Sequence, residues 1–207
     1  MVDNTKFLGV FIDQNLSFHK HIHYIKGKVS RGIGILYKCK PLLNENSLKI
    51  LYNAIIYPYF TYCIEVWGST YTTYTDVLSK IQKRAIRIIT GAKKYEHTQL
   101  LLKKLRILNL KEIYVYFVQL FMYKYHRKLL PQFFDDFFMK NTSVHNVNTR
   151  QQNYLHVPLI RTMPFSRTIR VSGVYLYNHF FKLAENNEFI GFNVSYNTYK
   201  FHLKNIS

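Results

Sequence analysis

Four basic residues at helical spacing form the clearest functional pattern in the sequence. Lys80, Lys83, Arg84 and Arg87 fall at i, i+3, i+4 and i+7, so they share one face of a helix that contains them. Such a row of cations can follow a phosphate backbone and release its counterions. The alternative is an ordinary solvated face. Solvated faces mix charge signs, however, and residues 80–106 hold nine bases against one acid, Glu96. We therefore predict nucleic-acid binding.

Further basic and aromatic residues extend this predicted site. Four more bases are assigned the same role, namely Lys26, Arg31, Lys93 and Lys94. Three tyrosines flank the cationic stretch and could stack on nucleobases, namely Tyr71, Tyr74 and Tyr95. Most other aromatic residues lie at core spacing and require no ligand.

The sequence offers little for catalysis by metal ions. Two-metal phosphoryl transfer needs clustered carboxylates, and the chain has only 11 Asp and Glu. One adjacent pair, Asp135-Asp136, lies among four Phe and superficially resembles the aromatic-Asp-Asp signature of polymerases. It follows a helix and Pro131 rather than lying on a β-hairpin, so we expect a capped turn flanked by core aromatics. We assign no catalytic residue.

Histidine and cysteine provide no metal site that we can predict. His19, His21 and His23 would share a face on a strand, but on a helix residues two apart diverge by about 200°. We expect one to pack at a helix start and the others to face solvent or phosphate. Cys39 and Cys63 are too few for a disulfide framework or a four-cysteine zinc site, so we expect inert thiols.

Composition indicates a folded chain with a polyanionic partner. Of the 207 residues, 48% are hydrophobic and 17% aromatic, which excludes intrinsic disorder as the default. Lys and Arg number 29 against 11 acids, a net charge of +18, which favours nucleic acid or an acidic membrane surface as a partner. We find no signal peptide and no apolar run that could span a bilayer. We therefore expect an intracellular protein, nuclear or cytoplasmic and not secreted, with no membrane partner and no small-molecule substrate.

The elements that would position these residues are mainly helical. Residues 6–13 are predicted to form a strand with no partner in the rest of the chain. Apolar residues at spacings of three and four then predict a series of helices, the first capped by Ser17 and the third stopped by Gly91. The predicted helices cover about 17–40, 47–57, 75–90, 98–105, 111–128, 172–184 and 195–205. The predicted fold class is mainly α, with a short N-terminal β-strand and a small mixed tail.

Several motifs, taken in order along the chain, carry a resemblance to a known family. They are Phe7-Leu8-Gly9-Val10, Leu51-Tyr52, Tyr62-Cys63, Val66-Trp67-Gly68, Gln82-Lys83-Arg84-Ala85, Asn148-Thr149-Arg150-Gln151, Ile169-Arg170 and Tyr177-Asn178. Together they resemble the carboxy-terminal part of the reverse transcriptases of non-LTR (LINE-type, jockey-like) retrotransposons. The resemblance covers nearly the whole chain, from about residue 6 to residue 205. The Tyr-Cys, Trp-Gly and Gln-Lys-Arg-Ala blocks are specific in this order, whereas each alone would be weak.

This resemblance implies an architecture for the chain. In such enzymes the Phe-Leu-Gly strand closes the palm near the primer grip, and the helices after it form the thumb. The thumb holds the template–primer duplex. The implied domains are a palm-end strand over 1–16, a helical thumb-like domain over 17–140, a linker over 141–153 and a small C-terminal segment over 154–207.

The resemblance also implies what this chain lacks. The catalytic aromatic-x-Asp-Asp motif and the fingers of the family should lie upstream of Phe7, and no endonuclease domain or zinc knuckle is present. We therefore expect a fragment, from a truncated copy or gene model, that binds no cofactor and does not polymerise DNA by itself. The parent RNA-directed DNA polymerase would need magnesium, and the implied partners are an RNA/DNA duplex and the missing fingers-palm portion. Two alternatives stay open: a stand-alone basic nucleic-acid-binding protein, and a non-functional product of a decayed element.

Overall fold

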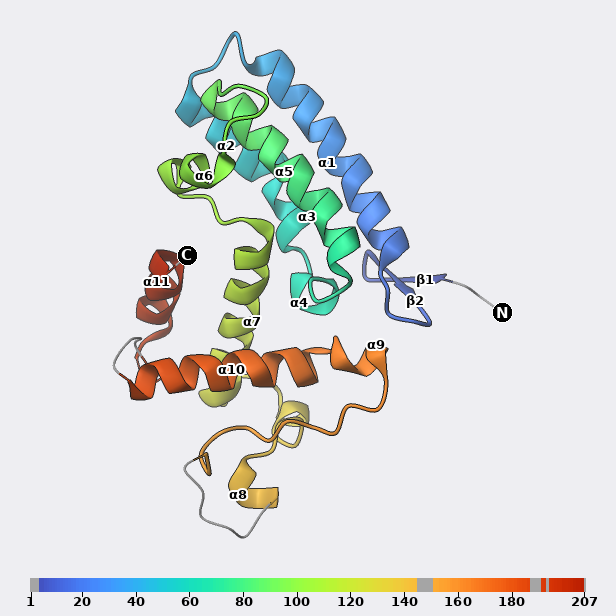
Figure 1. Ribbon diagram of the computed structural model, residues 1–207, viewed down its shortest axis with the longest axis vertical. Helices are drawn as coiled ribbons and strands as arrows, with labels where there is room; N and C mark the ends of the chain where they lie inside the picture. The colour runs from blue at the N-terminus through green and yellow to red at the C-terminus, as the bar shows by residue number, and fades with distance from the viewer. Residues whose placement is uncertain (1–3, 145–150, 187–190, 193, 207) are drawn as a thin grey trace. The chain divides into compact units, whose positions relative to one another are not determined.

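The structure is a computed structural model that describes residues 4–144, 151–186, 191–192 and 194–206. It is mainly α-helical, with one two-stranded antiparallel sheet at the N-terminus (Figure 1), so the predicted fold class is confirmed. Contacts divide the chain into two compact units, Met1–Tyr114 and Val115–Ser207. The boundary falls inside a helix rather than near residue 140, and the predicted domains stay a prediction.

The N-terminal strand is paired within the chain, contrary to the expectation of a single unpaired strand. It is a hairpin of β1 (Asn4–Phe7) and β2 (Val10–Asp13), in which Phe7 lies opposite Val10. The two-residue turn has φ of 43° at Leu8 and 83° at Gly9, the positive values that tight hairpins require. The hydroxyl of Tyr62 donates to the Leu8 carbonyl at 2.6 Å, which ties the turn to the helices.

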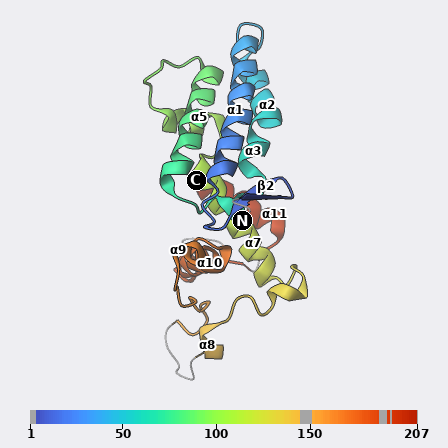
Figure 2. The same ribbon diagram turned by 90° about the vertical axis from the view of Figure 1, so that its right-hand side faces the viewer.

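Unit 1 continues with helices that pack side by side. They are α1 (His19–Cys39), α2 (Glu45–Ile55), α3 (Tyr57–Thr61), α4 (Ile64–Trp67), α5 (Thr72–Thr90), α6 (Thr98–Leu105) and the first turn of α7 (Leu110–His126). Figures 1 and 2 show α1, α2 and α5 alongside one another, and α1 makes its main contacts with α5. The packing is close at Gly32, where an added Cβ would lie 2.8 Å from Cγ1 of Ile56.

Asp13 organises the turn that leads into α1. One carboxylate oxygen accepts from the backbone N–H of Phe18 at 2.8 Å, and the other accepts from the N–H of Ser17 at 3.0 Å. Burial alone would raise the pKa of Asp13, but the hydrogen bonds from Ser17 and its neighbours outweigh burial and lower it. The prediction of Ser17 as the N-cap residue is wrong, because Phe18 holds that position in the left-handed conformation without a side-chain cap bond. The Ser17 hydroxyl still accepts from the His19 N–H, at a long 3.4 Å.

The core of unit 1 follows the predicted apolar spacing on its two longest helices. Buried residues recur every three or four positions on α1 (Ile22, Ile25, Val29, Ile33, Leu36) and on α5 (Leu78, Ala85, Ile86, Ile89). Gln82 lies in this core at 2% exposure, and its amide donates to the Tyr52 hydroxyl at 3.1 Å and to the Leu108 carbonyl at 2.9 Å. These bonds join α5 both to α2 and to the segment that enters α7.

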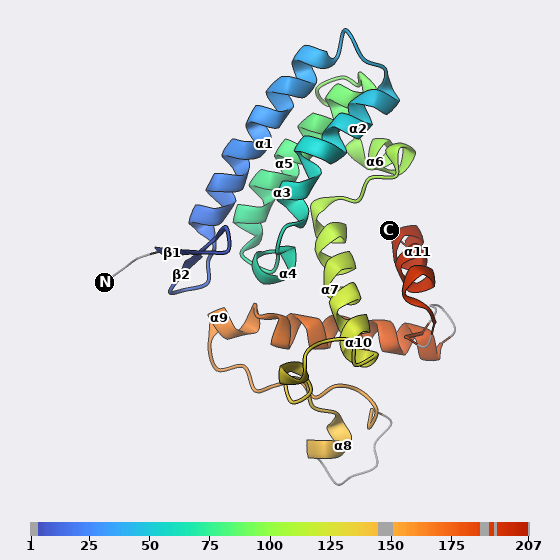
Figure 3. The same cartoon turned by 180° about the vertical axis from the view of Figure 1, so that it is seen from behind.

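Unit 2 is held together by stacked aromatic rings. Its elements are the rest of α7, the 3₁₀ turn η1 (Gln132–Phe134), α8 (Asn141–Val144), α9 (Met163–Ser166), α10 (Ile169–Glu185) and α11 (Tyr196–Ile206), as Figure 3 shows from behind. Tyr199 stacks on Tyr123 with centroids 4.7 Å apart and on Phe192 at 5.5 Å, and Phe192 stacks on Tyr177 at 4.6 Å. The column therefore links α7, α10 and α11.

The stretch predicted as a linker lies in unit 2 and is described only in part. Residues 145–150 lie outside the described ranges, and so does most of the Asn148-Thr149-Arg150-Gln151 motif. Within the described part, the N–H of Asn141 donates to the Tyr154 carbonyl at 2.9 Å, and Lys140 pairs with Leu155 in a short bridge. The linker role stays a prediction.

Candidate nucleic-acid interface

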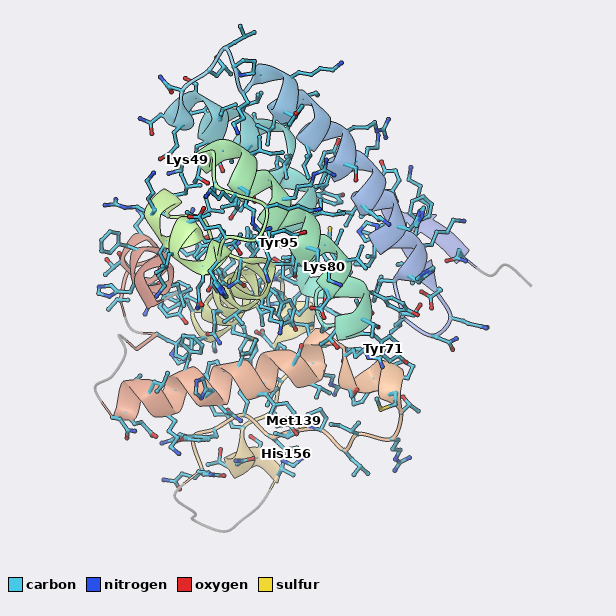
Figure 4. The ribbon with its side chains drawn as sticks, turned by 45° about the horizontal axis from the view of Figure 1, so that its top comes forward. Lys49, Tyr71, Lys80, Tyr95, Met139 and His156 are labelled. Atoms are coloured by element: carbon cyan, nitrogen blue, oxygen red, sulfur yellow. The ribbon has the colours of Figure 1, made fainter. Side chains whose placement is uncertain are left out.

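The four predicted basic residues lie on the outer side of α5. Lys80, Lys83 and Arg84 are exposed, and Arg87 is half-buried. The core stripe of the same helix occupies the other side, and Gly91 ends the helix in the left-handed conformation as predicted. From first to last the row spans about 10 Å along the helix axis, at 1.5 Å per residue. Figure 4 labels Lys80 on this helix.

Within the described residues, no carboxylate forms an ion pair with this row, although the exposed Asp76 lies one turn before Lys80 on the same helix. The ion pair observed in the described residues lies on other helices. It joins Nζ of Lys104 in α6 to Oε2 of Glu45 in α2 at 2.8 Å. Clustered cations without interleaved acids raise the local positive potential and attract polyanions. From Lys80 to Arg87 the outer side of α5 therefore presents a positive surface with no acid between its bases.

Arg87 differs from the other three because its guanidinium is already engaged. Nε and Nη2 both donate to the Glu96 carbonyl, at 3.1 and 2.9 Å. Arg87 thus holds the loop between α5 and α6 against the helix, which the spacing alone did not indicate. Its predicted contact with nucleic acid stays a prediction.

The loop after α5 carries the next two predicted bases, Lys93 and Lys94, both exposed. The carboxylate of Glu96 accepts from the Lys93 N–H at 3.2 Å, so the acid braces the loop. The Lys94 ammonium lies 5.5 Å from the centroid of the Tyr95 ring. Figure 4 labels Tyr95 in this loop. The loop therefore adds cations and one aromatic ring to the end of the row.

The two bases predicted on α1, Lys26 and Arg31, are also exposed. Because α1 packs against α5, the structure brings both predicted helices into one unit. A contact of these two residues with nucleic acid stays a prediction.

The flanking tyrosines differ in how much of the ring is free. Tyr95 is 85% exposed and Tyr71 is 43% exposed, while Tyr74 is only half-exposed. The Tyr74 ring lies 4.9 Å from the His19 ring and meets Tyr71 edge-on at 5.6 Å. Tyr71 and Tyr74 therefore already pack against side chains at the start of α5.

The three alternating histidines face different surroundings, as their helical spacing predicts. His21 is 2% exposed, while His19 and His23 are exposed. Both ring nitrogens of His21 are buried without a hydrogen-bond partner, and its ring lies 5.7 Å from that of Trp67. Burial in this apolar site lowers the pKa of His21 to about 4.

The Asp135-Asp136 pair lies in an exposed turn after η1. Phe138 is buried at 4% exposure, but Phe133 is 75% exposed, so the expectation of core aromatics on both sides is only half right. Within the described ranges, no three His, Cys, Asp or Glu side chains gather closely enough to hold a metal ion. In the same part of the chain, no helix has both the length and the apolar character needed to cross a membrane.

Comparison with known proteins identifies a relationship over half of the chain. No family model matches, and no solved structure matches. The RNA-directed DNA polymerase from mobile element jockey of Drosophila funebris is 31% identical over 98 residues, or 45% of this chain and 11% of that protein. The probable RNA-directed DNA polymerase from transposon X-element of Drosophila melanogaster is 29% identical over 107 residues, or 50% of this chain and 12% of that protein. The chain thus matches about a tenth of the length of these relatives. It is related to the RNA-directed DNA polymerases of non-LTR mobile elements, as its motifs indicate.

Proposed function

We propose that this chain is a thumb-like portion of a retrotransposon RNA-directed DNA polymerase and that it grips the template–primer duplex through α5. The observation that carries this proposal is the row of Lys80, Lys83 and Arg84, which is exposed on one helix face and forms no ion pair within the described residues. A nucleic-acid strand offers one phosphate per 3.4 Å of duplex axis. These three residues span about 6 Å along the helix axis, close to two phosphate intervals, so they match roughly three consecutive phosphates of one strand. The relationship to polymerases supports the choice of ligand.

In this proposal the chain binds the duplex and residues outside it perform catalysis. The partner would be the fingers-palm portion of the polymerase, which would also hold the magnesium ions. Asp135 and Asp136 receive no catalytic role. Full-length chain incubated with a primed RNA template, magnesium and nucleotides should give no primer extension. Processive extension would overturn this part of the proposal.

The binding role is tested by reversing the charge of the row. Lys80→Glu, Lys83→Glu and Arg84→Glu are combined, and Arg87 is left intact because it holds the neighbouring loop. Affinity for an RNA–DNA duplex is measured by fluorescence anisotropy over a series of salt concentrations. Each lost phosphate contact should reduce the slope of log K against log salt by about 0.9, so the triple variant should lose roughly 2 to 3 units of slope.

The matched control changes the net charge equally at other places. Lys140→Glu, Lys182→Glu and Lys200→Glu replace three exposed lysines of unit 2. This variant should keep most of the salt slope, because its lysines lie outside the proposed site. If both triple variants lost the same amount of slope in log K against log salt, binding would depend on overall charge and the role of α5 would be refuted.

A further inference from the structure

Tyr95 presents an aromatic ring to solvent beside the cationic row. It is 85% exposed, which leaves almost the whole ring available to a ligand. It lies between the exposed Lys94 and Glu96, in the loop that connects α5 to α6. The ring therefore adds little to the packing of unit 1 and is open to a ligand that approaches the neighbouring lysines.

The loop that carries Tyr95 is braced on both sides of the ring. After the ring, the Glu96 carbonyl accepts two hydrogen bonds from the Arg87 guanidinium. Before the ring, the Lys93 N–H donates to the Glu96 carboxylate. A braced loop loses less conformational entropy when it binds, so a ring held in this way is a more effective contact than one on a free loop.

Tyr95 also differs from the other tyrosines near the row. Tyr74 already packs against His19 and Tyr71, with ring centroids 4.9 and 5.6 Å away. Tyr95, by contrast, has the Lys94 ammonium 5.5 Å from its ring centroid and no aromatic neighbour among the described residues. An ammonium at that distance leaves the opposite face of the ring open and adds a charge that could meet a phosphate.

We propose that Tyr95 stacks on an unpaired nucleobase that adjoins the duplex held by α5. Bases inside a duplex are stacked on both faces, so an open ring can meet a base face only where the pairing ends. Aromatic stacking accepts any base, because every base has a π-face, and Lys94 would neutralise the phosphate of the same nucleotide. The ligand is thus a junction between duplex and single strand. This inference rests on the proposed function, since α5 supplies most of the affinity.

The test compares a blunt RNA–DNA duplex with the same duplex carrying one unpaired nucleotide. Wild-type chain should bind the overhang about fivefold or more tightly than the blunt duplex, the low end of the range for one base stacked on an aromatic ring. Tyr95→Ala should bind the overhang and the blunt duplex with equal affinity. Tyr95→Phe should keep the preference for the overhang, because the ring is retained. Tyr37→Ala is the matched control, since it removes a similarly exposed tyrosine from α1, at 67% exposure.

A second readout reports the stacking itself. With 2-aminopurine as the unpaired base, fluorescence should fall when wild type or Tyr95→Phe binds, and should not fall with Tyr95→Ala. A single unpaired nucleotide should suffice, because one ring stacks on one base.

The outcomes separate this inference from the proposed function. If Tyr95→Ala keeps both the overhang preference and the fluorescence change, the stacking role is wrong. Blunt-duplex binding that still depends on Lys80, Lys83 and Arg84 would leave the proposed function intact in that case. If reversing those three charges leaves blunt-duplex affinity unchanged, the proposed function fails, whatever the Tyr95 variants do.

Discussion

Acidification should destabilise unit 1 through one residue, His21. Its imidazole is 2% exposed, both nitrogens lack a hydrogen-bond partner, and the pKa is lowered to about 4 from an ordinary 6.5. Above pH 6.5 the folded and unfolded states are both neutral at this residue, so it carries no penalty. As the pH falls below 6.5 the unfolded chain takes up a proton that the folded chain rejects until about pH 4. Stability is therefore lost between these values and the loss then levels off.

The size of this loss follows from the two pKa values. Between pH 7.5 and pH 4.5 the difference in proton binding at His21 is worth about 2.5 kcal/mol. Trp67 is the one tryptophan of the chain, is fully buried, and lies 5.7 Å from the His21 ring. Urea unfolding followed by tryptophan fluorescence therefore reports on the same part of the protein at both pH values.

His21→Leu tests the assignment because it removes the proton site and keeps an apolar side chain. The variant should lose about 2.5 kcal/mol less than wild type between the two pH values. His23→Leu, which replaces an exposed histidine of the same helix, should behave like wild type. If His21→Leu shows the full wild-type loss on acidification, the acid sensitivity arises elsewhere and the reasoning from burial is wrong.

Three further substitutions test the local structure. Gln82→Leu should destabilise the chain by about 1–3 kcal/mol, because the buried Tyr52 hydroxyl and the half-buried Leu108 carbonyl lose their donor. Gln99→Leu, on the exposed side of α6, should change the free energy of unfolding little in the same urea experiment. Asp13→Ala removes the acceptor of the Ser17 and Phe18 N–H groups in the turn before α1 and should cost about 1–2 kcal/mol at pH 7. The control is low pH, where the carboxylate is protonated and the difference should shrink. Arg87→Met should speed trypsin cleavage in the loop after α5, because the bonds to the Glu96 carbonyl are lost; an unchanged cleavage rate would mean that the loop is held by other contacts.

The helical part of the fold could be predicted because its local and tertiary preferences agree. On α1 and α5 the apolar residues recur at three and four positions, and the same residues are buried. The basic row on α5 followed from that assignment, since four bases at helical spacing that avoid the apolar stripe must lie on the outer side. The end of α5 could be predicted at Gly91 because glycine readily takes the positive φ that commonly ends a helix.

The parts that could not be predicted depend on contacts between distant residues. Leu8 occupies a turn position at φ 43°. Because leucine is apolar and rare in such turns, the sequence around it resembles one continuous strand and not a hairpin. The turn before α1 is held by Asp13, whose bond to the Phe18 N–H spans five residues and follows no capping pattern. The engagement of Arg87 and the open ring of Tyr95 both depend on how the loop folds back onto α5. Residue spacing carries no information about either.

Gln82 gives α5 a fixed rotational setting. An apolar stripe alone tolerates small rotations of a helix about its axis, because dispersion contacts are not directional. Two directional bonds from one buried amide, to Tyr52 and to Leu108, do not tolerate them. Lys83 and Arg84 come immediately after Gln82 in the chain. The buried Gln82 side chain therefore fixes the direction in which these two exposed side chains leave the helix. A rotation of roughly 30° would shift their side chains by roughly 3 Å, about the rise from one phosphate to the next along a strand. In the proposed complex, this buried amide would therefore set which phosphates the surface lysines can reach.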